Sequence, residues 1–183
     1  MTIEAGPDEL YTTLARGTDV PALLQLVNSA YRGEGSRGGW TTETDLVAGL
    51  RIDAAALEEM VAAPDAALLV LRAQSGLFAC VQLSRLGAGV AALGLFSVRP
   101  ALQGNGLGRE LLAAAERYAR EHFGAEFVEI TVIADREELI AWYERRGYRP
   151  TGETRPYPQP DGRYGVPKRD DLRMVVLRRR LVP

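Results

Sequence analysis

The 183-residue chain has one cysteine, Cys80, and one histidine, His122. One cysteine cannot form an intrachain disulfide, a CxxC metal site or a redox pair. Cys80 stands in an apolar segment with no histidine close in sequence, and His122 stands late in a predicted helix, so we interpret both as structural residues. We therefore expect neither thiol catalysis nor a bound metal.

Long apolar runs and an excess of positive charge are also missing. No apolar run approaches the roughly 20 residues of a membrane-spanning helix, and residues 1–9 contain neither a basic nor an apolar targeting segment. The net charge of -2 provides no general attraction to nucleic acid or to anionic membranes. These absences favour a cytoplasmic protein that acts on a small molecule or on another protein.

The residues that are present are typical of a globular protein. Hydrophobic residues make up 46% and charged residues 25% of the chain, enough to bury a sizeable core. At this length we expect one domain spanning residues 1–183, with residues 1–8 flexible.

Periodicity and turn residues predict a mixed α/β chain in the order β-α-α-β-β-β-α-β-α-β-β. The strands are expected at residues 10–16, 68–71, 77–83, 90–98, 126–133, 148–153 and 172–181. The helices are expected at residues 19–31, 53–62, 104–122 and 137–146. Residues 32–39, with four glycines, and residues 155–171, with four prolines, are predicted to be loops.

A glycine-rich segment, Gln-Gly-Asn-Gly-Leu-Gly at residues 103–108, connects the strand that ends at Val98 to a long amphipathic helix. Glycines let consecutive backbone N–H groups converge, and the dipole of the helix favours negative charge at its N-terminus. The dinucleotide motif G-x-G-x-x-G does not fit, because Arg109 and Leu111 occupy the places of its third glycine. The segment predicts a phosphate site, with a plain helix-opening turn as the alternative.

A second segment, Leu-Ile-Ala-Trp-Tyr-Glu-Arg-Arg-Gly-Tyr at residues 139–148, places Trp142 and Tyr143 at the end of a short helix before a glycine. On the pattern alone these are core aromatics. Together, the two segments resemble the signatures of the GNAT superfamily of acyl-CoA-dependent N-acyltransferases, whose loop usually reads Q/R-x-x-G-x-G/A.

The resemblance implies the GNAT fold, an α/β fold with a mixed central sheet of about seven strands and flanking helices. It implies that the acetyl group of acetyl-CoA passes directly, with no covalent intermediate, to a primary amine of a small molecule or a protein. It leaves a homodimer open.

The resemblance also implies roles for particular residues. The loop amides wrap the CoA pyrophosphate, and the strand at residues 95–98 holds the pantetheine arm and offers an N–H to the oxyanion. Tyr143 is the implied general acid for the departing thiolate, since a phenol of pKa about 10 stays protonated at neutral pH yet donates to developing charge. The implied cofactor-binding residues are Phe96, Ser97, Val98, Gln103, Gly104, Asn105, Gly106, Leu107, Gly108 and Arg109.

Two positions depart from the family's usual pattern. Leu95 stands where many relatives carry a glutamate, and Arg136 where many carry an asparagine that touches the cofactor. We expect Glu129 to be the base that accepts the amine proton. Glu34, Glu43, an ordered water or the absence of any base are the alternatives. A strand with one solvent-exposed face would equally explain a glutamate at position 129. Arg136 could reach the cofactor or the substrate, or face solvent. A weakly active or inactive CoA-binding module is therefore the alternative function.

By the resemblance, the acceptor site is shaped by residues 31–42 and 155–167. The candidate substrate-binding residues are Tyr31, Glu34, Trp40 and Glu43, and the two segments also offer Arg37, Arg155, Tyr157 and Tyr164. Aromatic rings with carboxylates suit a cationic amine, whereas arginines suit an acceptor that bears a carboxylate or phosphate. Both interpretations stay open.

Overall fold

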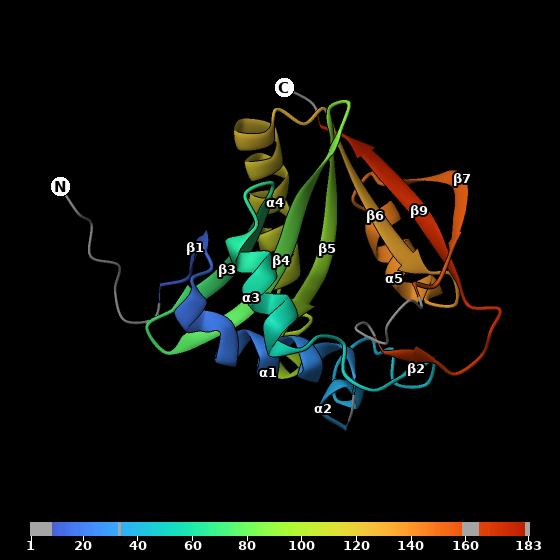
Figure 1. Cartoon of the computed structure of the whole chain (residues 1–183), viewed down its shortest axis with the longest axis horizontal. Helices are drawn as coiled ribbons and strands as arrows, with labels where there is room; N and C mark the ends of the chain where they lie inside the picture. The colour runs from blue at the N-terminus through green and yellow to red at the C-terminus, as the bar shows by residue number, and fades with distance from the viewer. Residues whose placement is uncertain (1–8, 33, 159–164, 182–183) are drawn as a thin grey trace.

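The computed structural model describes residues 9–32, 34–158 and 165–181, which form a seven-stranded sheet with helices on both faces (Figure 1). The strands of this sheet are β1 (Tyr11–Leu14), β3 (Ala66–Ala73), β4 (Gly76–Gly87), β5 (Val90–Val98), β6 (Phe127–Ile133), β7 (Arg149–Pro156) and β9 (Arg173–Arg180). The α-helices are α1 (Val20–Tyr31), α2 (Glu34–Arg37), α3 (Ala54–Ala62), α4 (Leu107–Phe123) and α5 (Glu137–Glu144). The strand order is β1-β3-β4-β5-β6-β9-β7, and only the β5–β6 pair of this sheet is parallel. The predicted mixed sheet with flanking helices is confirmed.

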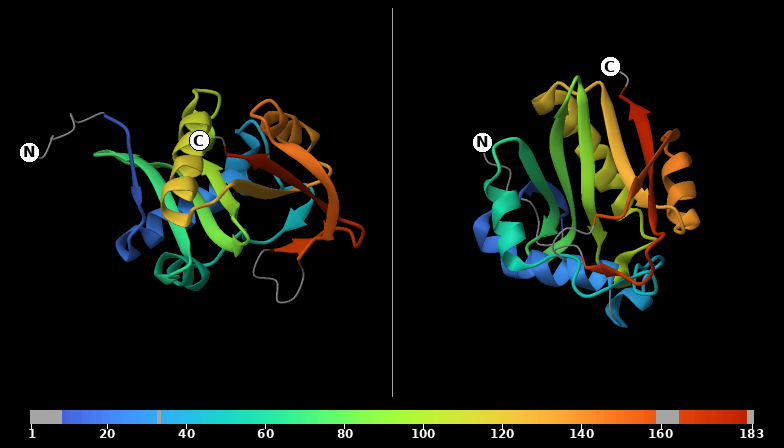
Figure 2. Two further views of the ribbon diagram at one scale, coloured as in Figure 1. Left: turned by 90° about the horizontal axis from the view of Figure 1, so that it is seen from above. Right: turned by 45° about the vertical axis from the view of Figure 1, so that its right-hand side comes forward.

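The helices bury the two faces of the sheet in separate clusters. α1 and α3 cover one face, and α4 and α5 cover the other, as the turned views in Figure 2 show. β3 serves both clusters, because successive side chains of a strand point to opposite faces. Leu68 packs with α1 and α3, whereas its neighbour Leu69 packs in the cluster of α4 and α5.

The sheet opens at its centre, between β5 and β6. In the described chain these strands pair only from Val90↔Phe127 to Leu93↔Ile130, and Figure 1 shows them parting beyond that point. Close to it, β5 slips in register against β4 and Leu95 takes a φ of 50°, a left-handed conformation that is costly for leucine. The parting leaves one edge of the second half of β5 without a strand partner from β6.

α4 is held in place by glycines at both ends. Gly106 is its N-cap with φ 86° and Gly124 its C-cap with φ 64°, conformations that a side chain would strain. Between them, Leu111, Ala115 and Ala119 form a fully buried stripe against the sheet.

No helix in the described ranges is long and apolar enough to cross a membrane.

The prediction that residues 32–39 are only a loop is wrong, because they contain the one-turn helix α2. The hydroxyl of Ser36, which is fully buried, hydrogen bonds to those of Thr42 and Thr44 at 2.6 and 2.9 Å. This tertiary anchor overrides the low helix propensity of the glycines.

The second predicted loop, residues 155–171, also contains regular structure. β7 extends to Pro156, and a short strand β8 (Val166–Pro167) pairs with β2 (Val47–Ala48). Val47 is buried with Tyr157 and Ile133 in a small third cluster. The pairing joins segments more than a hundred residues apart, which explains why local patterns did not reveal it.

Candidate active site

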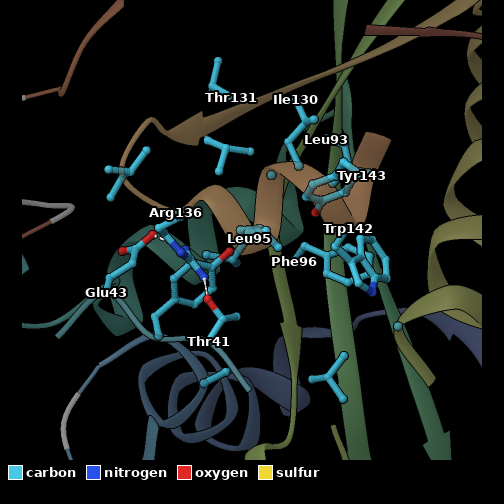
Figure 3. A pocket seen from close by; sticks show the side chains of 18 of the residues that line it. Thr41, Glu43, Leu93, Leu95, Phe96, Ile130, Thr131, Arg136, Trp142 and Tyr143 are labelled. Carbon is cyan, nitrogen blue, oxygen red and sulfur yellow. Dashed lines mark hydrogen bonds and ion pairs between the residues drawn. The ribbon is translucent and has the colours of Figure 1, made fainter. Parts of the chain in front are cut away.

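A pocket of about 900 Å³ lies where β5 and β6 part. Residues 93–96 and Val98 of β5 and residues 130–133 of β6 line it, together with the side chains of α5 drawn in Figure 3. The glycine-rich segment lines one end, and Tyr31, Thr41, Glu43, Arg51, Arg155 and Tyr157 line the other. We call these the loop end and the arginine end.

The loop end presents main-chain donors. Gly104 and Gly106 both have φ of 86°, and the amides of residues 104–106 donate to no described acceptor, although those of Gln103 and Arg109 do. Free N–H groups directly before a helix form an anion site, because the helix dipole adds partial positive charge there.

Two arginines add positive charge at the loop end. Arg109 lies in the first turn of α4, and Arg146 follows α5. The guanidinium of Arg146 stacks 3.6 Å from the ring centroid of Trp142 and donates to the Trp142 carbonyl at 2.7 Å. Burial, and then the neighbouring Arg145 and Arg109, lower the pKa of Arg146. This crowding of cations suits a ligand with several negative charges.

Tyr143 stands between the two ends, with 1% of its surface exposed. Its ring meets those of Trp142, Tyr148 and Phe96 edge-on, at centroid distances of 4.9, 5.4 and 6.4 Å. Its hydroxyl faces the pocket in Figure 3 and hydrogen bonds to no described residue. Burial raises the pKa of this phenol, so that it stays protonated through the physiological range.

Arg136, at the start of α5, does not face solvent but lies in the pocket wall with 6% of its surface exposed. Its guanidinium donates to Glu43 at 2.8 Å and to the Thr41 hydroxyl at 3.0 Å (Figure 3). Arg32 donates to the other oxygen of Glu43 at 3.3 Å. Glu43, itself 6% exposed, is thus held by two buried arginines.

Gln103 joins the end of β5 to Trp40. Its side-chain amide donates to the carbonyl of Val98 at 3.1 Å, at the end of β5. Its side-chain oxygen accepts from the amide of Trp40. A Cβ on Gly39 would lie 2.7 Å from that oxygen, so a side chain there would displace the Gln103 amide from this position.

The expected cofactor-binding residues fall into two groups. Eight of them line the pocket: Phe96, Val98, Gln103, Gly104, Asn105, Gly106, Gly108 and Arg109. Ser97 and Leu107 do not: the Ser97 hydroxyl donates to the Leu95 carbonyl, and Leu107 packs against the core of α4. Among the expected substrate-binding residues, Tyr31, Trp40 and Glu43 line the pocket, whereas the side chain of Glu34, like Tyr164, lies outside the described residues.

Glu129 lies away from the pocket lining and on the opposite side of β6 from Ile130, so its expected role as base does not agree with its position. Its carboxylate is buried, with one oxygen 3.0 Å from Arg155 Nη2 and the other 2.6 Å from Arg178 Nη2. These ion pairs, with β7 and β9, explain the carboxylate in an apolar strand.

The sequence interpretation missed Thr41, Arg51 and Arg146. Arg51 lies 5.0 Å from the centre of the Tyr31 ring, and Arg136 lies 5.9 Å from it. The signal for Arg146 was its place three residues after Tyr143, in the same segment as the aromatic pair. Nothing local distinguishes Arg51 from a surface arginine.

The family model described as the Acetyltransferase (GNAT) family matches residues 22–148, more than half of the chain. No curated protein sequence matches closely. Among solved structures, the ribosomal-protein-S18-alanine N-acetyltransferase from Escherichia coli has a TM-score of 0.69 at 18% identity, covering 96% of each chain. A chimeric spermidine N-acetyltransferase from Vibrio cholerae has a TM-score of 0.66 at 17% identity, covering 93% of this chain and 95% of that one. A Salmonella typhimurium protein, solved with its cofactor acetyl-CoA, has a TM-score of 0.67 at 19% identity, covering 96% of each chain.

Proposed function

Because the chain belongs to the GNAT family of acetyltransferases, we propose that it transfers the acetyl group of acetyl-CoA directly to a primary amine. The observation that carries this proposal is a single pocket with free loop amides at one end and the Tyr143 hydroxyl facing its middle. The loop amides suit the phosphates of the donor, and the Tyr143 hydroxyl suits the sulfur of its thioester.

The loop end fits the phosphates of acetyl-CoA, which would supply an activated acetyl thioester. The amides of residues 104–108 would bind the pyrophosphate, with Arg109 and Arg146 beside it. The unpaired edge of β5 beyond Leu93 would hydrogen bond to the pantetheine arm and direct an N–H toward the thioester carbonyl. These main-chain groups would orient the donor.

Tyr143 would act as the general acid. The amine nitrogen forms the new C–N bond while the C–S bond breaks, and the phenolic proton goes to the departing sulfur. A buried phenol with a raised pKa is reliably protonated before this step and becomes a strong base after it, so it is readily reprotonated from the pocket.

The amine must also lose a proton, and Glu43 is the one carboxylate among the described residues that line the pocket. Both of its oxygens already accept hydrogen bonds from buried arginines, so neither is turned toward an incoming amine. We propose that the proton leaves to water in the pocket. Glu43 then serves to hold Arg136 and Arg32 in place.

A second candidate function, CoA binding without catalysis, is favoured by Leu95 and Arg136 at positions that differ from the usual family pattern. Release of CoA thiol from acetyl-CoA separates the two functions. The enzyme should release CoA in proportion to added primary amine, whereas a binding module should bind acetyl-CoA and release CoA at the same slow rate with or without amine.

A further inference from the structure

The hydrogen bonds of Gln103 differ from those expected of a phosphate ligand. Its side-chain nitrogen donates to the Val98 carbonyl at 3.1 Å, and its side-chain oxygen accepts from the Trp40 amide. Only this orientation of the side-chain amide satisfies both partners, because one is an acceptor and the other a donor. The main-chain amide of Gln103 donates to the Pro100 carbonyl at 3.2 Å, whereas the amides of residues 104–106 donate to no described acceptor. Gln103 is therefore engaged with main chain at the point where the free loop amides begin.

The Trp40 amide that Gln103 accepts belongs to a segment that forms part of the pocket wall. We call residues 39–43 the strap. Trp40, Thr41 and Glu43 all line the pocket, and the Trp40 side chain is half-exposed. The strap therefore contributes an aromatic ring and two polar side chains to the surface that a bound acceptor would meet.

The strap is attached on two sides. On the α5 side, the Thr41 hydroxyl accepts from Arg136 at 3.0 Å and donates to Glu138 at 2.7 Å (Figure 3 shows the contact with Arg136). On the β5 side, the bond from the Trp40 amide to Gln103 is the one hydrogen bond, within the described residues, between the strap and either β5 or the glycine-rich segment. The strap thus joins α5 to the end of β5, and its attachment to β5 depends on Gln103.

Gly39 and the Gln103 side chain lie in close contact. A Cβ on Gly39 would be 2.7 Å from the side-chain oxygen of Gln103 and 3.1 Å from its amide carbon. Gly39 is not one of the described glycines with a left-handed φ, so alanine at this position would strain no backbone and would act by displacing the Gln103 amide. The link between the strap and β5 can therefore be broken from either side.

From these contacts we propose that Gln103 is a positioning residue for the acceptor amine: by holding Trp40 to the end of β5, it fixes the acceptor wall relative to the thioester. The inference rests on the proposed function and adds the role of one residue to it. The free edge of β5 would bind the pantetheine arm, so one link would set donor and acceptor against the same strand. Transfer needs the amine and the carbonyl in near-attack geometry, and a displacement of about 1 Å can lower the rate by about a hundredfold.

The test measures donor binding and amine use separately in Gln103→Ala. The full chain is assayed at saturating acetyl-CoA with the best wild-type acceptor among phenethylamine, lysine and putrescine. We expect kcat/KM for the amine to fall by about tenfold, as for the loss of one or two hydrogen bonds, while the calorimetric affinity for acetyl-CoA stays within about twofold. Loss of a phosphate ligand would give the opposite split.

Gly39→Ala breaks the same link from the strap and should show the same loss that is specific to the amine. Because both changes act on one contact, the double variant should lose no more than Gln103→Ala alone, rather than the product of the two losses. Two matched controls should keep the wild-type kcat/KM. These are Gln25→Ala, exposed on α1, and Gly17→Ala, where no atom lies within 4 Å of a Cβ.

Amide hydrogen exchange followed by mass spectrometry tests the link without any acceptor amine. In Gln103→Ala, peptides that contain Trp40 should exchange faster than in the wild type, because the Trp40 amide loses its acceptor. Peptides from α3 should exchange as in the wild type. Unchanged exchange at Trp40 would contradict the link itself.

The outcomes separate the inference from the function. A fall in acetyl-CoA affinity at least as large as the fall in kcat/KM for the amine would make Gln103 a donor ligand and overturn the inference. Unchanged kcat/KM in Gln103→Ala, or losses that multiply in the double variant, would also overturn it, and each of these results leaves the acetyltransferase function standing. If no primary amine increases CoA release by wild-type protein that binds acetyl-CoA, the function itself fails, and the inference with it.

Discussion

At the loop end of the pocket, the polar groups that face inward are main-chain amides of consecutive residues, whereas at the arginine end they are side chains from segments far apart in the sequence. A main-chain site depends on φ angles, and Gly104 and Gly106 provide them. A side-chain site depends on tertiary ion pairs such as Arg136–Glu43. A short contiguous motif can therefore form the loop end, whereas the arginine end depends on contacts made by the whole fold.

Tyr143 lies between the two ends, and its hydroxyl should matter to neither binding site. Tyr143→Phe keeps the ring packing and removes the proton, so turnover should fall by roughly 10²–10⁴-fold with little change in acetyl-CoA affinity or melting temperature. Turnover, calorimetric affinity and thermal unfolding of this variant give the three values. A turnover within about threefold of wild type would remove Tyr143 from the mechanism.

Glu43→Gln tests whether the arginine end is held by charge. Removing one partner of a buried ion pair leaves the others uncompensated, so the free energy of unfolding should fall by about 3 kcal/mol. Asp45→Asn is the matched control: its partner is Arg37 and its side chain is 71% exposed, so the loss should be under about 0.5 kcal/mol. Denaturant unfolding gives both values, and equal losses would contradict the account.

Gly106→Val tests whether the loop end is held by the main chain. A side chain at φ 86° is strained and blocks the approach of a phosphate, so acetyl-CoA affinity should fall by about ten- to a hundredfold, near the effect of losing one or two charged hydrogen bonds. Gly124→Val carries similar strain at the opposite end of α4, where no atom lies within 4 Å of a Cβ. Gly124→Val should lose stability but keep its affinity for acetyl-CoA. Equal acetyl-CoA affinities in the two variants would contradict phosphate binding at the loop end.

The smallest expected effect is a dependence of stability on alkaline pH. Tyrosines in the unfolded chain have a pKa of about 10, while burial raises that of Tyr31 to about 12. Between these values the unfolded chain binds fewer protons than the folded one, so stability should fall as pH rises. Tyr31→Phe should reduce this fall relative to wild type, as unfolding at about pH 8 and about pH 11 would measure. An unchanged fall would mean that the Tyr31 phenol does not contribute.

Most of the fold could be predicted because its signals are local. The apolar runs of β3 and β4 with the turn between them, the capped start of α3 at Asp53, and the glycine after α5 all lie within a few residues of the element that they define. The helix α2 and the β2–β8 pair were missed because their stabilising contacts come from elsewhere in the chain.

The same division applies to the site. The glycine-rich segment is contiguous, so the sequence alone could predict an anion site before α4. Glu129 is paired with arginines of β7 and β9, and Glu43 is paired with Arg32 and Arg136, all distant in the sequence. No local pattern could therefore distinguish a catalytic base from a carboxylate held in a structural ion pair. Arg51 acquires its place only through its contact with Tyr31.

The most direct test of the central claim follows an isotopic label in the acetyl group of acetyl-CoA, first with the protein alone and then with a primary amine that supports CoA release. Direct transfer between the two ends predicts no label on the protein in the mass spectrum of the denatured chain, and label on the amine nitrogen in equal amount to the CoA thiol released. Label retained on the protein and lost on addition of amine would contradict direct transfer. CoA release without label on the amine would contradict the acetyltransferase account as a whole.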